Sequence, residues 1–214
     1  MYSKFFKRAF DFLLSLFAIS VLSPFLVIFT VIGAIVMRGN PFFTQMRPGK
    51  IDKKSGTERI FKLIKFRTMT NAKDKDGNLL PDDKRLTAYG KFLRSTSIDE
   101  LPELFNILIG DMSIVGPRPL LVAYLPRYSP QQRRRHNARP GLTGYAQAYG
   151  RNSLTWEERF EKDVYYIDNI SFWLDVKIIF KTVSVVLKRE GISSETSVTM
   201  EEFMGSEKEM VSHE

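Results

Sequence analysis

The chain has 214 residues, of which 43% are hydrophobic, so it can bury one core but hardly two. It contains no cysteine and two histidines, which argues against disulfides, a cysteine nucleophile, a zinc centre and a histidine-centred catalytic triad. The net charge is +8, but residues 190–214 hold seven acidic residues and one lysine, so residues 1–189 carry +14 and indicate an anionic partner.

The first expected element is an apolar membrane segment, because residues 12–37 carry no formal charge. A straight helix over them would be about 39 Å long, enough to cross a hydrocarbon core of about 30 Å. Pro24 at the midpoint removes a backbone donor, so we expect a bend near Leu22, with the Ser23 hydroxyl capping the freed backbone groups.

Basic residues flank this segment on both sides. They include Lys7 and Arg8 before it and Arg38 and Arg47 after it. Because positive residues favour the cytoplasmic side, both flanks are expected there. A hairpin that enters one leaflet and returns satisfies this expectation, whereas the alternative is a single kinked helix that spans the membrane. The residues alone leave these two topologies open.

Beyond the membrane segment, the pattern predicts a mixed chain that is mostly helical. Two short strands, 41–45 and 60–66, are expected to form a β-hairpin around a turn-rich, charged loop. Short helices are expected over 86–94 and 101–108, where apolar residues recur at helical spacing.

The segment 171–189 predicts an amphipathic helix. Its apolar stripe holds Phe172, Val176, Ile179, Val183 and Val186, and lysines lie on another face. Such a helix either packs on a core or lies on an anionic membrane surface, and both remain open. After Gly191 the chain is small, polar and acidic, which predicts a loosely ordered tail over 191–214.

The adjacent acids Asp99 and Glu100 are the most informative pair. One alternative is that Ser97 and Glu100 form a capping box at a helix start. However, Pro102 disfavours helical geometry at Leu101, which places both acids in the turn before the helix. This position leaves them available for chemistry.

Arginines near these acids in sequence lie in loops rich in proline and glycine: 116–119, 139–144 and 150–152. An arginine held by a rigid loop loses less entropy when it grips a phosphate through two hydrogen bonds. Three such loops indicate a polyanionic ligand such as a diphosphate. A carboxylate can attack a phosphoryl group when cations screen their repulsion, and with so few nitrogen or sulfur ligands Mg²⁺ is the expected metal.

Four segments in this order resemble the bacterial sugar transferases, and most closely the small monotopic phosphoglycosyl transferases. They are Lys62–Met69, Arg94–Leu104, Gly110–Pro119 and Arg139–Gly144. The likeness covers residues 1 to about 190. Glu103 departs from the family pattern, which usually has Gln there, and adds an acid near the site.

The resemblance implies a mechanism and its residues. Asp99 would attack the β-phosphate of a UDP-sugar, release UMP and pass the sugar phosphate to a polyprenyl (undecaprenyl) phosphate, with Mg²⁺ as cofactor. Asp99 is thus the expected nucleophile and metal ligand, and Glu100 its partner. The expected substrate-binding residues are Lys65, Arg94, Arg118, Arg151, Asp163 and Asp175.

The resemblance also implies the architecture: a re-entrant helix-break-helix over 1–38 with its break at Ser23-Pro24, a cytoplasmic catalytic domain over 39–190 and the acidic tail. We expect a monotopic protein of the bacterial inner membrane, in contact with its lipids and with downstream glycosyltransferases, and no nucleic-acid partner. The step would begin glycoconjugate assembly, with an N-acetylated, bacillosamine-like sugar. The alternative function is a membrane-anchored basic adaptor for anionic lipid or nucleic acid, supported by the +14 body and the Arg133–Arg135 triplet.

Overall fold

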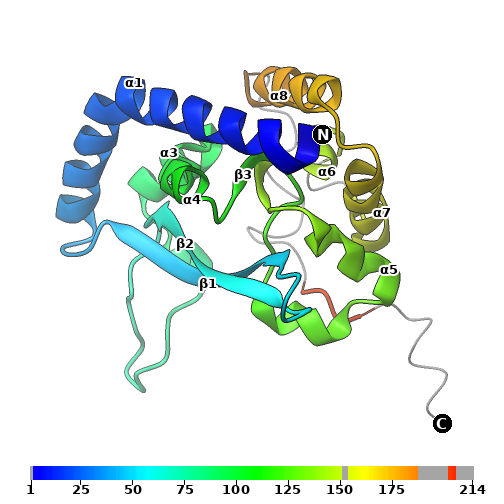
Figure 1. Cartoon of the computed structure of the whole chain (residues 1–214). Coiled ribbons are helices and arrows are strands. Elements are labelled where there is room, and N and C mark those ends of the chain that lie inside the picture. The colour runs from blue at the N-terminus through cyan, green and yellow to red at the C-terminus, as the bar shows by residue number, and fades with distance from the viewer. Residues whose placement is uncertain (1, 151–153, 188–201, 206–214) are drawn as a thin grey trace, which may run out of the picture.

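The computed structural model describes residues 2–150, 154–187 and 202–205. This part of the chain is mostly helical, with a small amount of strand (Figure 1). The α-helices are α1 Lys7–Val36, α2 Asp82–Arg85, α3 Ala88–Thr96, α4 Glu103–Ile109, α5 Pro130–Arg133, α6 Tyr145–Ala148, α7 Trp156–Asp168 and α8 Phe172–Leu187. The strands are β1 Phe42–Ile51, β2 Glu58–Phe66, β3 Ser113–Val115 and β4 Gly141–Thr143. A π-helix, η1 Tyr2–Phe6, precedes α1, and the 3₁₀ turns are η2 Ile98–Glu100, η3 Val122–Arg127 and η4 Arg134–Asn137.

Helix α1 bends without being interrupted. It runs continuously through Pro24, and Figure 1 shows it turning between its darker and lighter blue halves. Pro24 has no N–H for the carbonyl of Ser20, and the Ser23 hydroxyl donates to that carbonyl at 2.9 Å. The expected capping by Ser23 is therefore confirmed, while the expected break is a bend within one helix.

Both ends of α1 are bonded to the rest of the chain. Near its start, Arg8 donates from its two terminal nitrogens to the carbonyls of Ile107 and Leu108, each at 2.7 Å. Toward its end, the Tyr89 hydroxyl donates to the carbonyl of Phe29 at 2.8 Å. By length and composition α1 could cross a membrane. The structure nevertheless ties both of its halves to one folded body.

The expected hairpin is present and longer than the pattern suggested. Strands β1 and β2 pair antiparallel from Phe42 opposite Phe66 to Ile51 opposite Glu58, with an irregularity after Pro48. The strand continues through Pro48-Gly49 because a glycine fits there: a Cβ on Gly49 would lie 2.8 Å from the carbonyl oxygen of Arg59.

A second, smaller pairing joins two of the loops rich in proline and glycine. Strands β3 and β4 pair parallel over a few residues, and the loop after β3 packs directly on the loop before β4. A Cβ on Gly116 would lie 2.3 Å from the carbonyl oxygen of Arg139, so only glycine allows this approach. The contact fixes the loop that carries Arg118.

Helix α8 buries a different face from the one its apolar stripe predicted. Its buried side chains include Asp175, Ile178 and Val185, whereas Phe172 and Val183 of the stripe are exposed. The helix is apolar on more than one side, so the spacing of apolar residues alone did not identify the packed face. Phe180 and Trp173 add to its exposed apolar side, at 73% and 75% exposure.

Candidate active site

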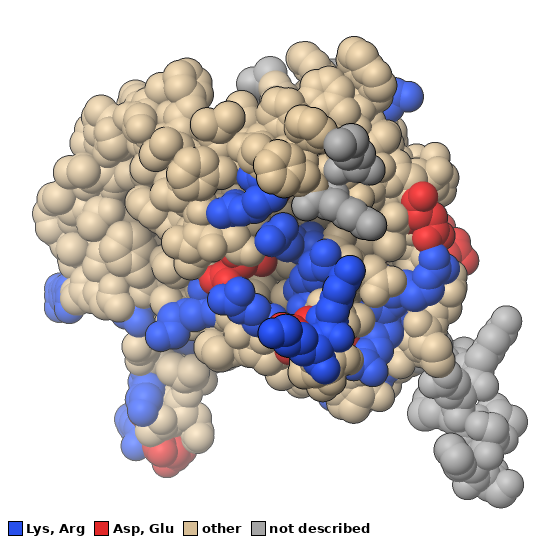
Figure 2. Space-filling model, viewed as in Figure 1, with Lys and Arg blue, Asp and Glu red and all other residues tan. Residues whose placement is uncertain are grey.

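A cavity of about 730 Å³ opens between the β1–β2 hairpin, the turn from α3 to α4, and the chain around Arg118 and α7. Figure 2 shows lysine and arginine side chains gathered around a hollow in the middle of one face, with acidic atoms visible between them. The basic lining residues are Arg47, Lys65, Arg67, Arg85, Arg94, Arg118 and Arg159, and the acidic ones are Asp82, Asp99, Glu100 and Glu103. The excess of cations suits a ligand with several negative charges.

The two central acids lie on a tight turn. Ser97 ends α3 in the left-handed region at φ 58°, and the chain then enters the 3₁₀ turn that holds Asp99 and Glu100. The Ser97 side chain makes no capping bond at the start of this turn. The capping-box alternative is therefore wrong, and both carboxylates lie along the cavity.

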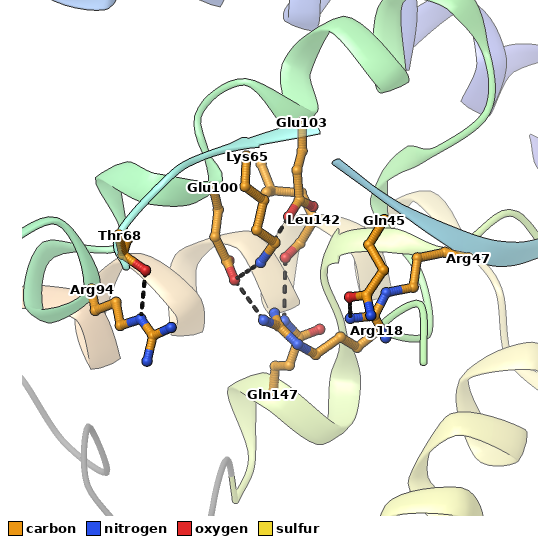
Figure 3. A network of polar contacts seen from close by, with 10 residues as sticks. All are labelled: Gln45, Arg47, Lys65, Thr68, Arg94, Glu100, Glu103, Arg118, Leu142 and Gln147. Carbon is orange, nitrogen blue, oxygen red and sulfur yellow. Dashed lines mark hydrogen bonds and ion pairs between the residues drawn. The ribbon is translucent and has the colours of Figure 1, made fainter. Parts of the chain in front are cut away.

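The carboxylate of Glu100 is held by two cations, as Figure 3 shows. Its Oε1 accepts from Lys65 Nζ at 2.7 Å and from Arg118 Nη2 at 2.5 Å. Burial raises the pKa of Glu100, but the charges of Arg118 and Lys65 outweigh burial and hold the pKa well below its usual range. Glu100 is thus a fixed anion that orders the two cations.

Asp99 is in the opposite situation. Within the described residues, its carboxylate makes no hydrogen bond or ion pair, although it lines the cavity. Burial, and then the neighbouring charge of Glu100, raise the pKa of Asp99 to about 6, against the lowering effect of nearby cations. Asp99 is therefore an available carboxylate that is mostly ionised at neutral pH.

A third acid shares Lys65. Glu103 is 2% exposed, and its Oε1 lies 3.0 Å from Lys65 Nζ. Burial raises the pKa of Glu103 to about 7, with a further increase from the charge of Glu100 and partial compensation by Lys65. The ammonium of Lys65 lies between two carboxylates, of which one is firmly ionised and the other titrates near neutrality.

The cavity also includes residues that sequence reasoning missed. Arg47 lies on β1 and Arg159 on α7, while Tyr124 and Trp156 form an aromatic part of the wall. Arg47 could have been found, because Arg47-Pro48-Gly49 repeats the pattern of an arginine beside proline and glycine. The α7 residues carried no such signal, since their spacing fits an ordinary amphipathic helix.

Of the basic residues predicted for the site, the structure brings Lys65, Arg94 and Arg118 together in the cavity. The Nε of Arg94 donates to the Thr68 hydroxyl at 3.1 Å, which orients its guanidinium (Figure 3). Arg151 lies outside the described residues.

The two C-terminal aspartates do not line the cavity. Asp163 is buried against Arg135, whose Nη2 donates to it at 2.7 Å. Asp175 accepts from Lys7 Nζ at 2.6 Å and from the hydroxyl of Tyr166 at 2.7 Å. The structure thus gives both carboxylates partners within the folded core.

The three arginines of the triplet that supported the adaptor alternative form ion pairs within the chain, two at the surface and one buried. Arg133 pairs with Glu58, Arg134 with Asp168, and Arg135 with Asp163. Arg139 donates to the carbonyl of Gly110 at the end of α4. Each arginine of the triplet is therefore paired with a carboxylate of this chain.

Among the described residues, no group of three or more His, Cys, Asp or Glu side chains is arranged to hold a metal ion. The donor set at the cavity is instead a single available carboxylate, Asp99, beside a basic lining. Mg²⁺ accepts such a site when phosphate oxygens and water supply its other ligands. The residues fit a metal that arrives with a phosphorylated substrate.

The comparison with known proteins supports one family. The profile described as bacterial sugar transferase matches residues 2–189. An uncharacterized sugar transferase of Bacillus subtilis is 50% identical over 201 residues, which cover 94% of this chain and 96% of that protein. The chain is 40% identical to a UDP-glucose:undecaprenyl-phosphate glucose-1-phosphate transferase of Klebsiella pneumoniae and 36% identical to an undecaprenyl-phosphate galactose phosphotransferase of Salmonella typhimurium. These matches cover 83% and 88% of this chain but only 39% and 42% of the longer relatives. The chain belongs to the bacterial sugar transferase family.

Proposed function

We propose that this chain transfers a sugar 1-phosphate from a UDP-sugar to polyprenyl phosphate through a covalent intermediate on Asp99. The observation that supports the proposal is that two adjacent carboxylates in one turn, Glu100 and Asp99, have different partners. Glu100 is held by Lys65 and Arg118, whereas Asp99 faces the same cavity without a partner among the described residues. A nucleophile needs an ionised carboxylate with an oxygen that no protein group engages, and the surroundings of Asp99 support this role.

In the first half-reaction, an oxygen of Asp99 attacks the β-phosphorus of the UDP-sugar. The bond from that phosphorus to the bridging oxygen breaks, and UMP leaves with the electron pair. In the second, an oxygen of polyprenyl phosphate attacks the phosphorus of the adduct, which restores the Asp99 carboxylate and forms a lipid-linked diphosphosugar. Arg94 and Arg118 offset the charge that builds up on the phosphoryl oxygens.

Mg²⁺ is the proposed cofactor, and Asp99 is the carboxylate that would help hold it beside the donor diphosphate. When bound, a divalent ion screens the repulsion between two anions. Glu100 does not compete for that role, because its ionised Oε1 is already engaged by Lys65 and Arg118.

We further propose that α1 enters the cytoplasmic leaflet of the inner membrane and returns. Its start is bonded to α4 through Arg8, and its later half to α3 through Tyr89. A bilayer cannot lie between two points that one compact domain holds. Exposed apolar residues continue from α1 onto neighbouring helices, including Ile109 of α4 and Trp173 of α8, at 68% and 75% exposure. This surface suits contact with lipid.

The identity of the sugar is a separate proposal. The resemblance to the smallest members favours an N-acetylated, bacillosamine-like sugar. The relatives named above carry glucose and galactose in their names, so the family includes different sugars. We expect the product to pass to downstream glycosyltransferases of polysaccharide, lipopolysaccharide or glycoprotein assembly.

The test is a burst experiment with purified protein, Mg²⁺ and a panel of UDP-sugars, without polyprenyl phosphate. We expect about one UMP per active site and a sugar phosphate on the protein, as in other two-step covalent schemes. EDTA should suppress the burst, and peptide mapping should place the adduct on Asp99.

The matched control is Glu100→Gln, which retains Asp99 but loses the anion that orders the cations. It should form the adduct slowly and still on Asp99. Normal turnover with acceptor but no burst without it would mean direct transfer in a ternary complex and would refute the covalent mechanism.

A further inference from the structure

The acidic tail was expected to be loosely ordered, yet one of its segments is packed into the body. Residues 202–205 are described, and Phe203 is only 1% exposed. Arg127 holds the segment from outside: its Nη1 donates to the carbonyl of Phe203 at 2.5 Å and to Glu202 at 2.8 Å. Figure 1 shows this segment, in red, in the lower part of the body near α5.

The ring of Phe203 lies at the centre of an aromatic cluster. Its centroid is 5.0–5.8 Å from those of four other rings, in edge-on, tilted and stacked arrangements. These rings belong to Tyr124, Tyr128, Trp156 and Phe160. Aromatic pairs of this kind each contribute about 0.5–1.5 kcal/mol beyond burial, so one side chain stabilises several others.

Two of these rings also form the aromatic wall of the cavity. Tyr124 and Trp156 line it, with ring centroids 5.7 Å apart and planes at 85°, whereas Phe203 does not line it. The indole N–H of Trp156 is buried and has no hydrogen-bond partner within the described part of the chain. Because that N–H is buried, what Tyr124 and Trp156 offer to the cavity is aromatic ring surface, on which a planar base can pack.

We propose that Phe203 is a positioning residue that fixes the aromatic wall, Tyr124 and Trp156, where it receives the uracil of the donor. This inference rests on the proposed function, because it assigns the wall to the nucleotide of a UDP-sugar. The segment acts from behind the wall: Phe203 packs on the side away from the ligand, and Arg127 keeps the segment in place.

The experiment uses the full chain with Trp173→Phe, which leaves Trp156 as the only tryptophan. UDP with Mg²⁺ is titrated while Trp156 fluorescence is followed, and acrylamide quenching reports how well the indole is shielded. Three further variants are compared in this background: Phe203→Ala, the milder Phe203→Leu, and Met204→Ala. Met204 is the matched control, because it is the next residue and is 69% exposed.

We expect the Kd for UDP to rise about tenfold in Phe203→Ala and about threefold in Phe203→Leu, which corresponds to the loss of one or two aromatic contacts. Acrylamide quenching should increase in the same order, and Met204→Ala should resemble the parent. In turnover assays the KM for the UDP-sugar should rise while the KM for polyprenyl phosphate stays constant. A merely structural role would instead lower the active fraction and leave both KM values unchanged.

The two proposals fail in different ways. If the parent binds UDP but folded Phe203→Leu keeps its Kd and its acrylamide quenching, the positioning role is overturned. If the parent binds neither UDP nor any UDP-sugar, both the proposed donor and the assignment of the wall to its base are overturned.

Discussion

Two aspartates that the sequence analysis assigned to one site have opposite surroundings. Asp175 is 4% exposed and accepts hydrogen bonds from Tyr2, Lys7 and Tyr166. Asp99 lines a cavity and has no partner among the described residues. The first carboxylate has its bonding satisfied inside the fold, and the second has bonding left for a ligand. Available bonding capacity is therefore what separates Asp99, the proposed nucleophile, from Asp175, and residue type alone does not separate them.

The largest effect should come from removing the available carboxylate. Asp99→Asn keeps the size of the side chain but removes the nucleophilic oxygen, so turnover should fall by at least about 10³-fold. The thermal midpoint should not fall and should rise somewhat at neutral pH, because no described partner loses a bond and the variant removes a carboxylate whose pKa is raised. UMP release and thermal unfolding in the same detergent would check both parts. A variant that keeps a tenth of the wild-type kcat would contradict covalent catalysis through Asp99.

Substitution of Asp175, whose hydrogen bonds are satisfied within the fold, should lower stability and leave substrate binding unchanged. Asp175→Asn leaves the buried ammonium of Lys7 without its counter-charge, at a cost of about 3 kcal/mol or about 10 °C in the thermal midpoint. The KM for the UDP-sugar should not change. A second substitution, Lys7→Met, removes the unpaired charge and should restore part of the lost thermal stability. A rise in donor KM without loss of stability would instead place Asp175 in substrate binding.

Glu103 lies between these two extremes, because its partner Lys65 is shared with Glu100. Its pKa in the folded protein is raised to about 7, so the folded state holds a proton that the unfolded state releases above its ordinary pKa of 4.5. Stability should therefore fall as the pH rises from about 4.5 to 7.

Glu103→Gln removes that titration and mimics the protonated form. It should be more stable than the wild type at pH 8 by about 2 kcal/mol, with a smaller difference at pH 5. Thermal midpoints at both pH values measure this, and Glu161→Gln, on the exposed face of α7, is the control. A wild type more stable than the variant at pH 8 would show that the charged pair with Lys65 is favourable.

The smallest effect concerns the charge on Asp99 itself. With its pKa near 6 before metal binds, the ionised fraction of Asp99 rises from about one tenth at pH 5 to nearly all at pH 8, so at Mg²⁺ concentrations far below saturation the first half-reaction should speed up about tenfold. The Glu103→Gln background removes the nearby group that titrates near pH 7. Rapid-quench measurement of UMP without acceptor gives the profile. A flat profile over this range would contradict the raised pKa of Asp99.

Local features of the chain were predictable from sequence. The hairpin, the helices on either side of Asp99 and the bend at Ser23-Pro24 follow from alternation, spacing and the missing N–H of proline. Asp99 and Glu100 lie in the turn before α4, as expected, but the expected reason was wrong: Leu101, which precedes Pro102, has right-handed helical angles (φ −56°, ψ −35°).

Features that depend on distant partners were not predictable. Lys7 and Asp175 are 168 residues apart, and no local sequence pattern predicts their ion pair. Strands β3 and β4 are three residues each, too short to be recognised by alternation. Phe203 lies in a polar segment, and its burial depends on a cluster that the rest of the chain assembles.

The two bonded halves of α1 have a consequence for how the acceptor arrives. In the proposed arrangement the protein rests in one leaflet at a fixed depth, so the cavity keeps a constant height above the lipid phosphates. A polyprenyl phosphate then finds the enzyme by lateral diffusion in two dimensions, while the water-soluble UDP-sugar arrives from the bulk in three. The rate of the second half-reaction should accordingly follow the mole fraction of acceptor in the bilayer, and diluting the vesicles at constant composition should leave it unchanged.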